Sequence, residues 1–288
     1  MPRGVALKTA LLINAATDIL AEIQPASVRA VCYQLFNRKL IPDMGKNETA
    51  RVSRILTKAR EDTVISWDAI IDETREVELR QSWNNPEQYV ATVMRSYRRD
   101  RWDDQPRRLM VVSEKGTVGG TLRPIMHEYG VPFQVYHGFG SATALHDLAE
   151  LSVQDTRPLT LLYCGDHDPS GRYMSDMDLP DRITRYGGNA WIERVAVTAE
   201  QIADHDLPTF TAAEKTKDAR HAWFVTEHGQ TCCELDALNP NVLRDLVRRA
   251  IRAHLDRNAW SRAESVENAE RASLTDFFES WPGMGKSA

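Results

Sequence analysis

Two carboxylates stand one residue apart, directly after an apolar run in the middle of the chain. Asp166 and Asp168 follow the run 159–164, and Pro169 ends the extended segment. Side chains at positions i and i+2 of an extended backbone point in the same direction, so both carboxylates can bind one hard cation. Mg²⁺ takes oxygen ligands and often joins protein acids to a phosphate. The pair therefore predicts a Mg²⁺ site, with Mn²⁺ as the alternative ion.

A third acid, Glu114, follows an earlier apolar run at 109–112. Burying an acid near a strand end is costly unless its charge is compensated. Glu114, Asp166 and Asp168 are therefore the predicted metal ligands of a site for phosphodiester chemistry. The competing interpretation is that the two aspartates only cap the following helix, and that Glu114 belongs to a simple turn.

Tyr33 is the candidate nucleophile. Arg29 precedes it by four residues, so the two side chains lie on one face of a helix. A guanidinium one turn away lowers the cost of forming a phenolate and binds a phosphate oxygen. Tyrosine needs such help because its ordinary pKa is about 10. The competing interpretation is an amphipathic tyrosine packed at a domain edge.

The elements that must position the acids alternate regularly along the chain. Strands are predicted at 109–112, 133–136, 159–164 and 192–197, with helices at 117–129, 142–151 and 171–185. Such alternation predicts an α/β fold with a parallel sheet covered by helices on both faces. Ligands in these folds bind beyond the carboxyl ends of the strands, which is where the three acids fall.

The N-terminal region is predicted to hold three helices, at 6–23, from Ser27 and from Asn47, followed by a β-wing at 64–70. The region from Arg29 to Arg60 has eight basic residues and two acids, although the whole chain has a net charge of −5. The third helix has an apolar stripe on one face and a basic stripe of Arg51, Arg54 and Lys58 on another face. This pattern is typical of a helix that contacts the phosphates of double-stranded DNA. A solvated helix face is the competing interpretation.

Composition indicates a globular protein with one large domain or two ordinary ones in 288 residues. No run of eighteen apolar residues occurs, so no contact with a membrane is expected. The four cysteines lack Cys-x-x-Cys spacing, which favours a reducing cytoplasm over a zinc site or disulfide framework. The predicted organisation is a DNA-binding domain at 1–80, a connecting helix and linker at 81–105, an α/β domain at 106–200 and a C-terminal extension at 201–288 with a helix and a loose tail.

These motifs together resemble a known family over roughly residues 25–200. The acidic motifs are similar to those of the Toprim domain, a metal-binding module of topoisomerases, bacterial primases and some nucleases: Glu114-Lys115, then Asp166-His167-Asp168-Pro169-Ser170-Gly171. Arg29 and Tyr33 match the Arg-x-x-x-Tyr motif of the type IIB topoisomerase (topoisomerase VI) A subunit and its meiotic double-strand-break relatives. The segment Glu234 to Leu238 also resembles a bacterial and phage group described as topoisomerase VI A-like.

The resemblance implies a winged-helix domain followed by a Toprim domain, and an enzyme that cleaves DNA. Tyr33 would form a 5′-phosphotyrosyl link with support from Arg29. Glu114, Asp166 and Asp168 would hold the metal, and Glu114 would also help to move a proton. A homodimer is implied because the family pairs the tyrosine of one protomer with the metal site of the other. Strand passage in the family needs a separate ATPase subunit, of the GHKL type.

One departure from the family pattern concerns the residue before the nucleophile. The family usually has an aromatic residue there, and this chain has Cys32. Two other functions stay open. A hydrolytic nuclease would use water at the same metal site without a covalent intermediate. A non-catalytic DNA-binding protein would use the Toprim fold as a scaffold or dimer platform.

Overall fold

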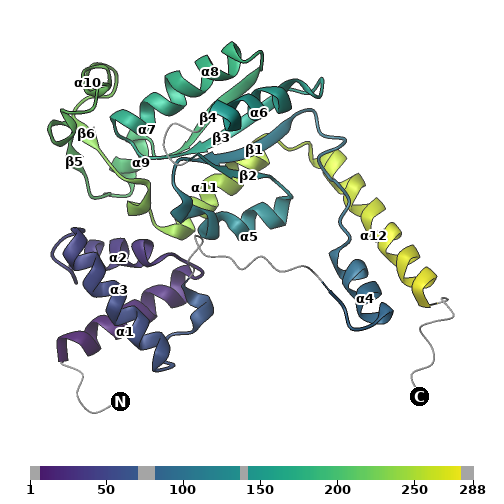
Figure 1. Cartoon of the computed structure of the whole chain (residues 1–288), viewed down its shortest axis with the longest axis horizontal. Helices are drawn as coiled ribbons and strands as arrows, with labels where there is room; N and C mark the ends of the chain where they lie inside the picture. The colour runs from purple at the N-terminus through teal and green to yellow at the C-terminus, as the bar shows by residue number, and fades with distance from the viewer. Residues whose placement is uncertain (1–6, 71–81, 137–141, 280–288) are drawn as a thin grey trace. The chain divides into compact units, whose positions relative to one another are not determined.

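The computed structural model describes residues 7–70, 82–136 and 142–279. The chain forms two compact units, each built from distant parts of the sequence (Figure 1). The first unit combines residues 1–75 with 109–253, and the second combines 76–108 with 254–288. All of the predicted site residues belong to the first unit.

A four-stranded parallel sheet forms the centre of the first unit, in the order β2-β1-β3-β4 (Figure 1). Its strands are β1 (Arg108–Ser113), β2 (Phe133–Val135), β3 (Leu159–Cys164) and β4 (Ala190–Ala196). The chain moves outward from β1 to β2 and then crosses back to β3, so the direction of winding reverses between β1 and β3. Ligands in α/β folds bind outside the carboxyl ends of the strands at such a switch point.

Helices cover both faces of this sheet. On one face, α6 (Ala142–Val153) and α8 (Leu179–Arg185) contribute Leu148 and Ile183 to a core shared with the inner strands. On the other face, α5 (Gly119–Tyr129) packs against α11 (Pro240–Ala253) (Figure 1). The predicted α/β class with a parallel sheet is therefore confirmed.

The helix predicted at 171–185 is divided into three segments. α7 (Pro169–Tyr173) is followed by a π-helical turn over Met174–Asp178 and then by α8. Pro180 lacks an N–H group and therefore cannot complete an α-helical hydrogen bond at this junction. The wider π turn accommodates that break without ending the helical path.

Short elements complete the α/β part of the first unit. They are η2 (Gly116–Val118), α9 (Ala199–Asp204), β5 (Phe210–Thr211), η4 (Ala212–Lys215), α10 (His221–His228), β6 (Thr231–Cys232) and η5 (Leu235–Ala237). β5 and β6 pair in an antiparallel manner. This region matters for the site, because it delivers Lys215 and Glu234 beside the strand-end acids.

The N-terminal helices lie close to their predicted bounds and share one apolar core. They are α1 (Leu7–Ile23), α2 (Val28–Asn37) and α3 (Lys46–Glu61). Ser27 caps α2 by accepting a hydrogen bond from the Ala30 amide, as predicted.

The segment predicted as the wing is not a hairpin in the described part of the chain. Residues 64–70 contain the 3₁₀ turn η1 (Trp67–Ala69), and a single bridge joins Ile70 to Ala26. Residues 71–81 lie outside the described ranges. The winged-helix assignment therefore stays a prediction.

The second unit pairs α4 (Pro86–Ser96) with α12 (Arg257–Glu279). Residues 257–279 of the region that was expected to end in a loose tail form a helix of 23 residues, and residues 280–288 lie outside the described ranges. Its buried positions Ala259, Ala263 and Glu267 recur every four residues and form one face. Among the helices described, none is both long enough and apolar enough to span a bilayer.

Candidate metal and tyrosine site

Glu114 and Asp166 meet where the neighbouring strands β1 and β3 end. A Glu114 carboxylate oxygen accepts a hydrogen bond from the Asp166 amide at 2.7 Å. Gly171 allows this approach, because a Cβ at that position would lie 2.8 Å from the same Glu114 oxygen and would also collide with the Asp166 carbonyl. The sheet topology thus positions these two acids together, as the sequence predicted from their strand-end locations.

A backbone pairing anchors the Asp166 loop to the segment that follows β6. His167 and Cys233 exchange two amide hydrogen bonds, of 2.8 and 2.9 Å. The Asp166 carboxylate accepts a third hydrogen bond from the Leu235 amide at 2.7 Å. This pairing fixes Glu234, which lies between Cys233 and Leu235, beside the strand-end acids.

Asp168 has a different set of partners. Its Oδ1 accepts a hydrogen bond from the Gly171 amide at 2.8 Å and so caps α7, the alternative role that the sequence allowed. Its Oδ2 lies 2.8 Å from the Lys215 ammonium. Within the described ranges, Glu114, Asp166 and Asp168 do not form a group whose ligand atoms all lie within 4.8 Å of one another. The three acids share one edge of the sheet but do not converge on one point.

The electrostatics of the site are dominated by burial. Burial, and then the charge of Asp166, raise the pKa of Glu114 to about 7. Burial also raises the pKa of Asp166, although the Lys115 ammonium at 2.8 Å acts in the opposite direction. Tyr163, on β3, is fully buried, and its hydroxyl finds no hydrogen-bond partner among the described residues. The end of β3 therefore holds polar groups that have fewer hydrogen-bond and charge partners than buried groups usually have.

The side chains at the strand ends are of the kind that binds a hard divalent cation. All of the candidate ligands are carboxylates, and Glu114 forms no ion pair within the part of the chain that is described. The surrounding carboxylates outnumber their cationic partners: Glu114, Asp166, Asp168, Glu234 and Asp236 share Arg29, Lys115 and Lys215. A divalent ion would offset the excess negative charge, and it would have to displace Lys215 to reach Asp168.

Arg29 and Tyr33 lie on one face of α2, as predicted, with the guanidinium 5.5 Å from the centre of the Tyr33 ring. Arg29 forms an ion pair with Glu234 and a second one with Asp236 at 2.8 Å. The Glu234 carboxylate lies close enough to the Tyr33 hydroxyl to raise its pKa, and both residues line the same cavity. Both residues of the motif therefore meet at Glu234.

Lys115 connects this tyrosine to the strand-end acids. Its ammonium lies 3.3 Å from Glu234, 3.3 Å from Asp236 and 2.8 Å from Asp166. Tyr33 and Asp166 are therefore joined through Glu234 and Lys115. This connection is made within a single chain.

Tyr33 lines a cavity of about 360 Å³. The cavity wall also includes Phe36, Met44, Pro208, Thr209, Phe210, Glu214, Lys215 and Glu234. The Tyr33 side chain is largely covered, and the residue is only 6% exposed. Burial, followed by the charge of Glu234, raises the pKa of Tyr33, whereas Arg29 acts to lower it. The phenol therefore keeps its proton at neutral pH.

Four charged residues of this network were given no chemical role by the sequence: Lys115, Glu234 and Asp236 were named only within segments that carry the family resemblance, and Lys215 was not singled out. Glu234 and Asp236 have the same i, i+2 spacing as Asp166 and Asp168, which was the available signal. However, β6 before them has only two residues, so no apolar run marks them as strand-end acids. Their closeness to Tyr33 depends on contacts about 200 residues apart in the sequence.

The predicted DNA-binding residues occupy α3, with two of the three paired to acids of the same region. Arg51 binds Glu48, and the Lys58 ammonium lies 2.8 Å from Asp62. The exposed Arg54 donates a hydrogen bond to the Ala50 carbonyl at 3.3 Å. The three basic residues thus lie on one helix as predicted, but neighbouring acids offset part of their charge.

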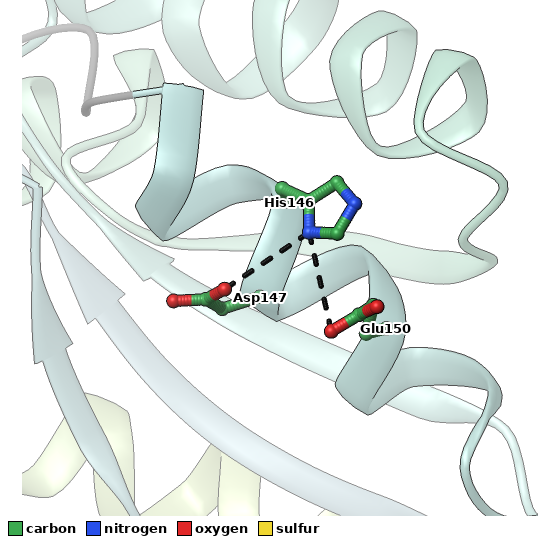
Figure 2. A group of neighbouring side chains, drawn as sticks. All are labelled: His146, Asp147 and Glu150. Carbon is green, nitrogen blue, oxygen red and sulfur yellow. Dashed lines mark ion pairs between the residues drawn. The ribbon is translucent and has the colours of Figure 1, made fainter.

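A separate group of potential metal ligands lies on α6. Figure 2 shows His146, Asp147 and Glu150 side by side on α6, with the His146 Nδ1 atom 4.0 Å from Asp147 and 3.9 Å from Glu150. It is the only such group within the described ranges whose ligand atoms all lie within 4.8 Å of one another. All three side chains are exposed. Histidine and glutamate four residues apart on a solvated helix form an ordinary surface pair.

No protein-family model matches this chain, and no curated protein matches it. The likeness to Toprim and topoisomerase VI A-like proteins therefore depends on the motif residues alone. The geometry around Tyr33 and Asp166 is an independent basis for proposing what the protein does.

Proposed function

We propose that the protein is a metal-dependent enzyme that cleaves double-stranded DNA by transesterification, with Tyr33 as the nucleophile. One observation carries this proposal: Glu234 and Lys115 link the Tyr33 hydroxyl to the strand-end acid Asp166. A nucleophile and a phosphate-activating site must lie together for such chemistry. The resemblance to the topoisomerase VI A subunit supports the same reaction.

The roles follow from the contacts. The Tyr33 oxygen bonds to phosphorus as the bond to the 3′ oxygen breaks, which leaves a 5′-phosphotyrosyl link. Arg29 and Lys115 supply positive charge beside the developing anion, and Glu114, with a pKa of about 7, is suited to proton exchange near neutral pH. Glu114, Asp166 and Asp168 would hold Mg²⁺ or Mn²⁺, which would polarise the phosphoryl oxygen when bound. The exposed face of α3 would contact the DNA backbone.

The proposal includes partners that the family resemblance implies. A homodimer would place two tyrosines on opposite strands, and a separate GHKL-type ATPase would be needed for strand passage. The connection between Tyr33 and Asp166 within one chain means that cleavage of a single strand is expected even from a monomer.

The decisive experiment is a covalent-adduct assay. Protein is incubated with end-labelled duplex DNA and Mn²⁺, then denatured, and the DNA is examined for protein attached to 5′ ends. Wild type is expected to form the adduct, and Tyr33→Phe to abolish it. Tyr97→Phe, in the second unit, is the matched control. An adduct that persists in Tyr33→Phe would refute the assignment of the nucleophile.

A second candidate is a hydrolytic nuclease that uses water at the same acids. The burial of Tyr33 and its raised pKa favour this alternative, because a protonated phenol is a weak nucleophile. It predicts cleaved DNA without an adduct, insensitivity to Tyr33→Phe, and loss of cleavage in Asp166→Asn. The same assay therefore separates the two reactions.

A further inference from the structure

Glu234 occupies a special position in the ionic network. Its carboxylate shares a cavity wall with Tyr33, forms an ion pair with Arg29 and lies 3.3 Å from the Lys115 ammonium. Its side chain is about 30% exposed and lines the cavity next to Tyr33. Glu234 therefore lies beside the tyrosine that would react and is open to solvent at the same time.

The backbone holds this carboxylate firmly. Cys233, on one side, pairs with His167, and Leu235, on the other side, donates its amide to the Asp166 carboxylate. Glu234 is thus anchored through both chain neighbours to the loop that carries the strand-end acids. A group held in this way needs little reorganisation to act on Tyr33.

We propose that Glu234 is the catalytic base that accepts the proton of Tyr33 during attack on the phosphate. The Tyr33 O–H bond breaks and its proton passes to a Glu234 oxygen while the Tyr33 oxygen bonds to phosphorus. The bond from phosphorus to the 3′ oxygen breaks, and that oxygen leaves as a hydroxyl after taking a proton from water. This inference rests on the proposed transesterification and assigns the one proton that the attack must remove.

Neighbouring groups are less suited to this role. Arg29 and Lys115 are cations whose pKa values the surrounding acids raise, although burial acts to lower them, so they cannot accept a proton. Asp236 is buried and is engaged by Arg29, Lys115 and the Thr117 hydroxyl. Glu214 lines the cavity but accepts the Thr211 amide in a capping box.

The charge state of Glu234 agrees with this assignment. Burial works against ionisation, but Lys115 and Arg29 outweigh it and hold the pKa of Glu234 at about 2. The carboxylate is therefore ionised and ready to accept a proton throughout the neutral range. Because a carboxylate of such low pKa is a weak base, the proton moves only as the bond to phosphorus forms.

The test compares single-turnover rates of adduct formation for wild type, Glu234→Gln and Glu234→Asp, with full-length protein, labelled duplex DNA and Mn²⁺. Gln keeps the shape and an acceptor oxygen but cannot take the proton, and general-base catalysis typically contributes about 10²–10⁴-fold. The rate of adduct formation by Glu234→Gln is expected to be about 10²–10⁴-fold lower than that of wild type, with DNA affinity unchanged. Glu234→Asp keeps the charge and is expected to be at least tenfold faster than Glu234→Gln. Glu214→Gln, in the same cavity, is the control at wild-type rate.

The outcomes separate this inference from the proposed function. If wild type forms no adduct, the transesterification proposal fails and the role of Glu234 fails with it. If wild type forms the adduct and Glu234→Gln does so within twofold of its rate, only the role of Glu234 is overturned. Equal rates for folded Glu234→Asp and Glu234→Gln also overturn it. Aspartate can accept a proton and glutamine cannot, so a catalytic base requires the two rates to differ. A second readout is the ultraviolet titration of tyrosinate, in which Glu234→Gln should lower the pKa of Tyr33.

Discussion

Glu114 and Glu234 illustrate how environment separates two identical side chains. Glu114 is half-buried beside Asp166 and forms no ion pair with any residue of the described ranges, and burial raises its pKa to about 7. Glu234 is held between Arg29 and Lys115, and its pKa is about 2. Two carboxylates whose pKa values are pushed apart in one site are a common sign of acid–base roles. The same asymmetry has consequences for stability and for metal binding.

Glu114 should make the protein less stable as the pH rises. Its pKa is about 7 when folded, against an ordinary value of 4.5. The folded state therefore keeps a proton that the unfolded chain releases, and stability is lost between about pH 4.5 and pH 7. In EDTA, the free energy of unfolding of wild type relative to Glu114→Gln should fall by about 3 kcal/mol from pH 4.5 to pH 7.5. Urea unfolding measures it, and a pH-independent difference would contradict the prediction.

Lys215 competes with a cation for Asp168, because its ammonium lies 2.8 Å from the carboxylate. Removing the ammonium in Lys215→Met should free that ligand and strengthen Mn²⁺ binding by about tenfold, or about 1.4 kcal/mol. Calorimetric titration with Mn²⁺ alone measures the change. Lys217→Met, an exposed neighbour, should leave the affinity unchanged. Equal affinity of Lys215→Met and wild type would show that Asp168 is not a ligand.

At the scale of elements, α11 joins the N-terminal helices to the α/β part of the first unit. Arg244 is buried on this helix and donates to the backbone carbonyls of Thr121, Ile23 and Pro25 at 2.8–3.0 Å. One guanidinium thereby satisfies acceptors on α5, at the end of α1 and in the turn between α1 and α2. These three partners are uncharged carbonyl groups, and burial lowers the pKa of Arg244. This position requires arginine because its guanidinium can donate to three carbonyls at once, and not because it forms an ion pair.

Replacing this guanidinium should be strongly destabilising. Arg244→Met leaves three backbone carbonyls without their donor and should cost about 3 kcal/mol of unfolding free energy. Arg248→Met, one turn away, removes exposed pairs with Asp245 and Glu128 and should cost less than about 1 kcal/mol. Chemical denaturation of both variants provides the comparison. Similar losses for the two would show that the buried contacts carry no special weight.

At the scale of the whole molecule, the chain passes from one unit to the other three times, after residues 75, 108 and 253. The second unit has its own interior, in which the nearly buried Glu267 binds Arg101 at 2.8 Å and Arg271 at 3.3 Å. Trp102 and Trp260 pack edge to face in the same unit. None of these residues belongs to the tyrosine and acid network. The second unit is therefore expected to respond separately to substitution.

Glu267→Gln should weaken the second unit alone. Breaking a buried ion pair by removing one charge costs about 3–5 kcal/mol, so amide exchange should rise over 86–96 and 257–279. Exchange in β1 and β3 should stay as in wild type, since their core contains none of these residues. Hydrogen exchange with mass spectrometry measures both regions. Faster exchange in β3 as well would show that the units unfold together.

The sequence by itself determined the parallel α/β core, because apolar strands and amphipathic helices alternate with little ambiguity and local periodicity specifies them. It also determined that Glu114 and Asp166 lie together, since strand ends share one edge. Only the tertiary structure decided that Lys215 holds Asp168, that Glu234 meets Tyr33, and that the tail forms α12 against α4. Each of these contacts joins residues distant in the chain or lacks a long apolar run before it. No local pattern encodes such contacts, because burial by a remote partner decides them.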